Sequence, residues 1–105
     1  MLSIHDVMLD AIGAMRPIVR AIEKHDRDLG NQLKRASSSV VLNVAEGSGS
    51  FGGVRRQRYR TALGSARETM SCLLVAERAG YVGAVPKALI AAMNRVIGTL
   101  VRVAA

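Results

Sequence analysis

A chain of 105 residues has room for one domain and not for two, and it can bury only about two-thirds of the surface that its unfolded form exposes. The longest stretch without a charge, 36–45, has ten residues, which excludes a transmembrane helix of roughly 20. With one cysteine and no basic, then apolar, leader at the N-terminus, the composition predicts neither a disulfide framework nor a secretion signal, and it suits the cytoplasm.

The balance of apolar and basic residues indicates two kinds of partner. Half of the residues are hydrophobic but only 3% are aromatic, an excess of aliphatic surface that points to burial against copies of the same chain. Fifteen basic residues against eight acidic ones give a net charge of +7. Twelve of the fifteen are arginine, which binds phosphates and carboxylates with a planar fork of donors. We favour a polyanionic partner over the simpler reading that the charge serves solubility.

Apolar periodicity predicts a first helix over residues 4–24 and a second over 29–46. The first keeps its apolar face beyond Pro17, so we expect one helix that bends there. An aspartate in the polar break at 25–28 is available to cap the second helix, and Gly47 is expected to end it. The residues expected to face the core are Ile4, Val7, Met8, Ala11, Met15, Ile18, Val19 and Ile22 in the first segment, and Leu33, Ala36, Val40 and Val44 in the second.

Two further helices are predicted over residues 54–79 and 86–103. The stretch 47–53 has four glycines and is the clearest loop, Gly80 is expected to end the third helix, and Pro86 to begin the fourth. The expected core residues are Tyr59, Ala62, Leu63, Ala66, Met70 and Leu73, followed by Leu89, Met93, Val96, Ile97, Leu100 and Val101. No strand alternation occurs, so the predicted fold class is all-α, a single up-and-down antiparallel four-helix bundle over residues 1–105.

The loop 47–53 contains a G-x-G-x-x-G pattern, but its context argues against a dinucleotide site. That fingerprint requires a preceding strand within a βαβ unit, whereas an amphipathic helix precedes it here. We therefore interpret the loop as an interhelical hinge.

Arginines crowd the segment that follows this loop. Arg55, Arg56, Arg58 and Arg60 lie within six positions, and no acidic residue occurs between Glu46 and Glu68. Positive charge at a helix start is unfavourable because the helix dipole prefers anions there. At 3.6 residues per turn, four arginines form a stripe about 33 Å long beside the apolar face. They are Arg56, Arg60, Arg67 and Arg78. We predict a polyanion-binding surface, with Lys34 and Arg35 as an extension, over a merely solvated face.

No residue set predicts catalysis or a metal site. Asn43 and Glu46 are expected to satisfy backbone groups at a helix end, rather than to act as a buried base. Cys72 has no histidine nearby in sequence and falls away from the predicted core face, so we expect a passive surface or interface thiol. His5 and His25 are isolated, which does not suit a zinc site. We predict no enzyme activity and no cofactor.

Four pieces of sequence together resemble one known family. They are QLKRA at 32–36, LNVAEGSG at 42–49, YRTALGSARE at 59–68 and AGYV at 79–82. The specific feature is the occurrence of two motifs at this spacing in one chain. The first motif contains Asn43, Glu46 and Gly47. The second motif consists of Gly64, Ser65 and Glu68. The chain resembles, over about residues 2–100, the four-helix-bundle family named for 23S rRNA intervening-sequence proteins, which also includes the accessory variability determinant of diversity-generating retroelements.

The resemblance implies a four-helix protomer that assembles into a ring-shaped homopentamer with a basic surface. In the retroelement member, such a ring binds a reverse transcriptase and nucleic acid. This chain departs from the family at Ser50, where members often carry arginine, and in having only arginines as charges at the start of the third helix. These departures leave the partner open between RNA, DNA and a protein such as a reverse transcriptase.

Three functions follow from these observations, in order of preference. The first is a non-enzymatic oligomer that binds RNA or DNA through the phosphate backbone, with weak sequence specificity because few aromatic residues are available for stacking. The second is a protein-binding scaffold whose arginine-rich face docks an acidic partner. The third, a helix-turn-helix reader of DNA, is disfavoured by a loop of seven residues where that motif has a turn of about 3–4.

Overall fold

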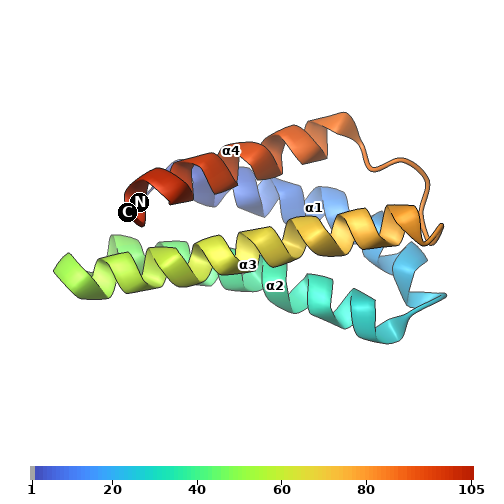
Figure 1. Ribbon diagram of the computed structural model, residues 1–105, viewed down its shortest axis with the longest axis horizontal. Helices are drawn as coiled ribbons and strands as arrows, with labels where there is room; N and C mark the ends of the chain where they lie inside the picture. Colours follow the sequence, from blue (N-terminus) through green and yellow to red (C-terminus); the bar gives the residue numbers. More distant parts are fainter. Residues whose placement is uncertain (1) are drawn as a thin grey trace.

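The computed structural model describes residues 2–105, which form four helices and no strand (Figure 1). The helices are α1 (Ile4–Glu23), α2 (Arg27–Ser48), α3 (Gly52–Arg78) and α4 (Lys87–Val103). Successive helices run in alternate directions along an axis of 42 Å, and each packs against two others in the cyclic order α1, α2, α3, α4. The all-α fold class predicted from helical periodicity is confirmed.

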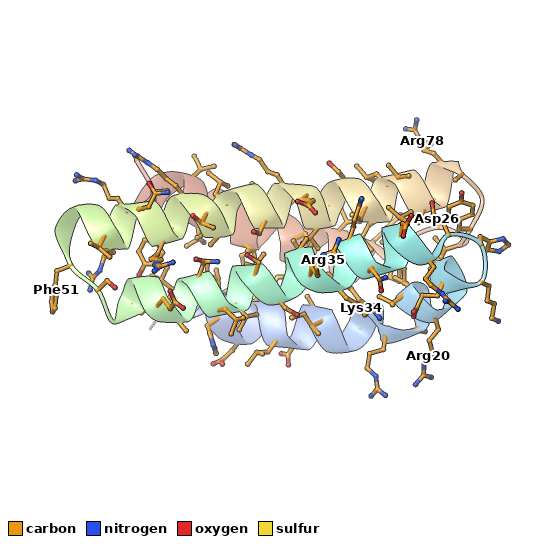
Figure 2. The ribbon with its side chains drawn as sticks, turned by 90° about the horizontal axis from the view of Figure 1, so that it is seen from below. Arg20, Asp26, Lys34, Arg35, Phe51 and Arg78 are labelled. Atoms are coloured by element: carbon orange, nitrogen blue, oxygen red, sulfur yellow. The ribbon has the colours of Figure 1, made fainter. Side chains whose placement is uncertain are left out.

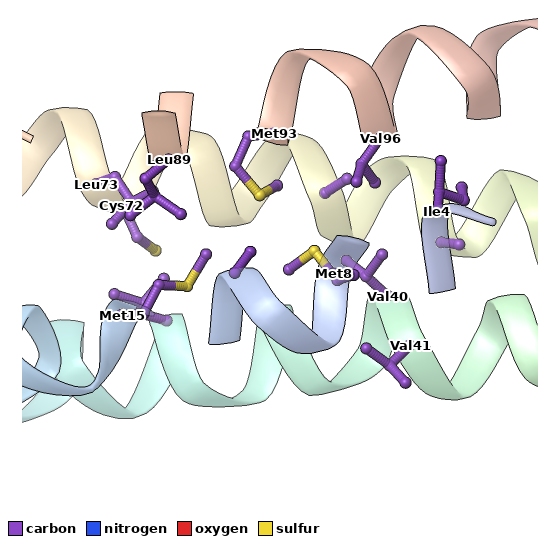
Figure 3. Packing of buried hydrophobic residues seen from close by; sticks show 14 of the residues in the cluster. Ile4, Met8, Met15, Val40, Val41, Cys72, Leu73, Leu89, Met93 and Val96 are labelled. Carbon is purple, nitrogen blue, oxygen red and sulfur yellow. The ribbon is translucent and has the colours of Figure 1, made fainter. Parts of the chain in front are cut away.

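The core is a column of aliphatic and methionine side chains to which every helix contributes (Figure 3). The fully buried large side chains are Ile4, Met8, Met15, Ile22, Leu33, Val40, Val44, Thr69, Leu73, Met93, Val96 and Leu100. α1 continues through Pro17 as one helix, as expected, and the proline lies on its exposed side. Thr69, the polar member of the set, donates its hydroxyl to the Ser65 carbonyl oxygen at 2.8 Å, so no buried hydroxyl is left without a partner there.

Two predictions about the core are wrong. Val101 was expected inside but is 45% exposed, because Leu100 takes the inward position and adjacent helical residues point about 100° apart. Cys72 was expected at the surface but is only 4% exposed, and Figure 3 shows it beside Leu73 and Leu89. The buried face of α3 extends further round the helix than the aliphatic residues alone suggest, because small Ala76 and Cys72 also lie inside.

The turn between α2 and α3 is shorter than its glycines suggested. α2 continues through Gly47 to Ser48, so Gly47 does not end the helix, and only residues 49–51 separate the two helices. Gly47 is buried, and a Cβ atom there would lie 2.5 Å from Cε1 of Tyr59. The glycine therefore permits close packing of α2 on the Tyr59 ring. The tight turn itself depends on Gly52, whose φ of +55° suits glycine.

A side-chain cap marks the start of α2, and a glycine motif marks the end of α3. The Asp26 carboxylate accepts a hydrogen bond from the Leu29 backbone N–H at 2.9 Å, so it is the predicted N-cap, although α2 begins two residues earlier than expected. α3 ends in a Schellman motif around Gly80, whose φ is +76°. In it, the Tyr81 N–H donates to the Ala76 carbonyl and the Gly80 N–H to the Glu77 carbonyl.

Candidate nucleic-acid interface

The arginine stripe predicted on α3 is exposed along its whole length. Arg56, Arg60, Arg67 and Arg78 all have exposed side chains, and Figure 2 shows Arg78 projecting from the far end of α3. Nε of Arg60 donates to the Ala104 carbonyl oxygen at 3.2 Å, which places the stripe on the side of α3 next to α4. Within residues 2–105, the side chains of Arg56, Arg67 and Arg78 make no hydrogen bond or ion pair. Their guanidinium groups are available to an external anion.

Arg55, in contrast, is used inside the protein. Its Nε donates to the carbonyl oxygens of Gly47 at 3.1 Å and Ser50 at 2.8 Å, and its Nη2 to that of Ser48 at 3.4 Å. These carbonyls belong to the end of α2 and the turn after it, where backbone acceptors lack helical partners and the helix dipole favours a cation. Arg55 therefore stabilises the α2–α3 turn, and its Nε and Nη2 groups are directed at backbone carbonyls rather than at solvent.

Arg58 is paired with an acidic residue of α2. Its Nε lies 3.1 Å from Oε2 of Glu46, and both side chains are about half exposed. An exposed pair of this kind contributes well under about 1 kcal/mol to stability, but it partly neutralises the Arg58 charge. Glu46 was predicted to satisfy backbone groups at a helix end. This prediction is wrong, because α2 extends beyond Glu46 to Ser48.

Lys34 and Arg35 lie further along α2 than the partners of the Arg55–Arg60 cluster, and a groove of about 520 Å³ that also includes Glu46 and Arg58 connects them to it. The α2–α3 contacts of Ser39 with Ser65 and of Gly47 with Tyr59 set the register of the two antiparallel helices. In this register Arg35 lies about 18 Å along α2 from Gly47, at 1.5 Å per residue, and Figure 2 shows Lys34 and Arg35 away from the end of the bundle that carries Phe51. Nζ of Lys34 is also 3.5 Å from Oε2 of Glu23 on α1.

The motif residues that carry the family resemblance mostly hold α2 against α3. Ser65 Oγ donates to Ser39 Oγ at 2.8 Å, and Asn43 Nδ2 donates to the Ser39 carbonyl at 2.9 Å and to Ser39 Oγ at 3.1 Å. Asn43 therefore bonds one turn back within α2, rather than at a helix end as predicted. Gly64 and Glu68 are exposed, and nothing lies within 4 Å of a Cβ atom built on Gly64.

A groove between α1 and α2 was not anticipated from the sequence. It has a volume of about 350 Å³, and half-buried Ile12 and Val19 and buried Met15 form its apolar lining. Exposed Arg16 and Arg20 border it together with the Glu23–Lys34 pair. This is an apolar slot with a predominantly cationic rim.

Phe51 is the other feature that sequence reasoning missed. It is 83% exposed at the tip of the α2–α3 turn, next to Val54, which is 59% exposed (Figure 2). The only sequence signal was a single aromatic residue within a glycine-rich loop.

The groups considered for chemistry lie apart from one another. Burial, followed by the nearby Glu68 carboxylate, raises the pKa of the Cys72 thiol above its usual value of 9.0, which favours the unreactive thiol over the thiolate. The His25 ring stacks on Tyr81 with ring centres 5.2 Å apart, and His5 Nδ1 lies 3.6 Å from Asp6 Oδ1. Among residues 2–105 no group of three potential metal ligands occurs, and no helix combines the length and apolarity needed to cross a membrane.

Comparison with known proteins places the chain in a family. A crystal structure at 1.70 Å of a protein of unknown function, from the S23 ribosomal protein family of Bacteroides thetaiotaomicron VPI-5482, superimposes with a TM-score of 0.79. That protein is 15% identical over 96% of this chain and 97% of its own, so the likeness shows the fold alone. No curated protein matches. The family described as 23S rRNA-intervening sequence protein matches residues 6–101, and the chain therefore belongs to this family.

Proposed function

We propose that this protein is a non-enzymatic, basic oligomer that binds nucleic acid through the phosphate backbone. The observation that carries the proposal is the set of exposed, unpaired guanidinium groups of Arg56 and Arg67, with Arg60, on the half of α3 that contains no acidic residue. Arginine binds phosphate oxygens with two donors at once, so such a stripe suits a chain of phosphates. Because the family's name refers to 23S rRNA, RNA is the first nucleic acid to test.

The salt dependence of binding tests this proposal. Fluorescence anisotropy of a labelled short RNA duplex, titrated with protein at several salt concentrations, should give a log K that falls linearly with log salt. Each phosphate contact adds a slope of about −0.9 for B-form duplexes and about −0.7 for single strands. We expect a slope of about −2 to −3 for three arginines that contact phosphates. An affinity that does not change with salt would contradict phosphate binding.

We further propose that the working form is a homo-oligomer, with a ring of five copies as the expected state. Several large apolar side chains remain exposed on the protomer, on all four helices and the α2–α3 turn. Those that we expect to be buried between protomers lie on the helices and are Leu9, Leu42, Leu74 and Val101. Light scattering at micromolar concentration should give a mass several times 11.2 kDa. A stable monomer would contradict this proposal.

The α1–α2 groove supports a second candidate function, a scaffold for an acidic protein partner such as a reverse transcriptase. Its apolar lining and cationic rim suit an amphipathic helix with acidic flanks, which would bury apolar residues in the slot and pair with Arg16 and Arg20. Replacing both arginines with glutamine should lower the affinity for a protein partner but leave the affinity for RNA nearly unchanged. The reverse pattern would favour the nucleic-acid function.

A further inference from the structure

Phe51 occupies an unusual position for the only phenylalanine of the chain. It lies at the end of the bundle, in the turn between α2 and α3, and its side chain is 83% exposed. Figure 2 shows it projecting at the end opposite Asp26 and Arg78. No contact with the core explains an aromatic residue there, because the hydrophobic cluster of buried and half-buried residues does not include it.

The ring of Phe51 is supported on one side by a fixed cation. Cζ of Arg55 lies 5.7 Å from the ring centre, within the distance for cation–π attraction. The same guanidinium donates to carbonyl oxygens of Gly47, Ser48 and Ser50, which hold it in place. The turn thus fixes a cation against the ring, and the high exposure of Phe51 shows that most of the ring's surface remains open to solvent.

The positive charge around the Phe51 ring favours an anionic ligand. Between Glu46 and Arg60 the chain carries four arginines and one acid, a net charge of +3, and that acid is already paired with Arg58. The exposed guanidinium of Arg56 lies one residue beyond the ring's supporting arginine. A ligand that combines a flat apolar ring with nearby negative charge would fit both features, and a nucleotide with an unpaired base has this chemistry.

We propose that Phe51 is a stacking platform for an unpaired base of single-stranded nucleic acid, with Arg55 as the residue that positions the ring. This inference rests on the proposed function, and it adds a preference for unpaired over paired strands at the tip of each bundle. The base stacks on the open face of Phe51 while the adjoining phosphates approach Arg56. Base stacking tolerates any sequence because every base has a π face, so the preference is for strandedness and not for sequence.

The test compares Phe51→Ala with a matched variant, Val75→Ala, which also shortens an exposed apolar side chain but lies near the other end of α3. Affinities are measured by anisotropy for a short unstructured RNA and for the same sequence in a duplex. Phe51→Ala should weaken single-strand binding about tenfold, the effect of losing one aromatic–base stack. Its duplex affinity, and both affinities of Val75→Ala, should change less than about twofold.

A direct signal comes from Phe51→Trp, because the chain has no tryptophan of its own. Indole emission should be quenched by saturating single-stranded RNA and little changed by the duplex, and this variant should keep the parent's single-strand affinity. Equal losses for both RNAs in Phe51→Ala, or no loss in either, would overturn the stacking role while the proposed function stands. A parent that binds neither RNA would overturn the proposed function itself. A Phe51→Ala protein that falls to monomer mass would instead show Phe51 to be a contact between protomers.

Discussion

Replacing Arg56, Arg60 and Arg67 together with glutamine should lower the affinity for RNA by about 100-fold at 0.15 M salt. Each arginine that contacts a phosphate releases about 0.9 of a condensed counterion, and at this salt concentration that release is worth about a fivefold change in K. Three contacts multiply to about 100-fold, and the salt slope should become less steep by two to three. Helix content should not change, since glutamine is nearly as good a helix former as arginine.

The chain offers a control with the same loss of charge. Arg16 and Arg20 on α1 and Arg95 on α4 are also exposed, and within residues 2–105 none of them makes a side-chain hydrogen bond or ion pair. Their triple glutamine variant should reduce RNA affinity only a few-fold, because these arginines lie outside the α3 stripe and act on a bound strand only through charge that salt screens. Equal losses in the two triple variants would show that the field of the whole molecule, and not the α3 stripe, binds RNA. If the α3 variant dissociates to monomers, the stripe is an assembly interface.

The choice of these three arginines shows how far the sequence could predict the site. Sequence reasoning recognised the acid-free arginine segment and its stripe, both of which depend on local spacing. It could not separate Arg55 and Arg58 from their neighbours, since their partners are the α2 carbonyls and Glu46. Those partners come close only when the α2–α3 turn closes. A variant that also removed Arg55 would confuse loss of binding with loss of the turn.

The fold was predictable because helical periodicity also depends on local spacing. The prediction failed where packing between helices decides the structure. Periodicity located all four helices, with α1 and α4 within one residue at each end. Gly47 was misread because glycine commonly ends helices, whereas here its missing side chain makes room for the Tyr59 ring. The loop argument against a helix-turn-helix motif also fails, because the turn is short. The antiparallel packing of α2 along α3 disfavours that motif instead, since its helices cross at about 90–120°.

Cys72 provides the second large expected effect, on stability. The sequence predicted a passive surface or interface thiol, but the thiol is buried in the core, so Cys72→Ser should lower the free energy of unfolding by about 1–3 kcal/mol. Cys72→Ala removes the same sulfur without burying a hydroxyl and should cost about 1 kcal/mol. Urea unfolding of the three proteins measures both values. A Cys72→Ser protein as stable as the parent would contradict the core assignment.

The pH dependence of that comparison follows from the raised pKa of Cys72 in the folded chain. Below the pKa of the thiol in the unfolded chain, near 9.0, both states hold the proton and the parent keeps its full advantage over Cys72→Ala. As the pH rises above that value, the unfolded thiol ionises while the folded thiol stays protonated, so the unfolded state is favoured and the advantage shrinks. Unfolding at about pH 8 and about pH 10 should therefore show the parent and Cys72→Ala converging. The contributions of all other groups are common to both proteins and cancel in the difference. A difference in unfolding free energy between the parent and Cys72→Ala that does not change with pH, together with rapid reaction of the native thiol with a disulfide reagent at neutral pH, would contradict a protonated, buried Cys72.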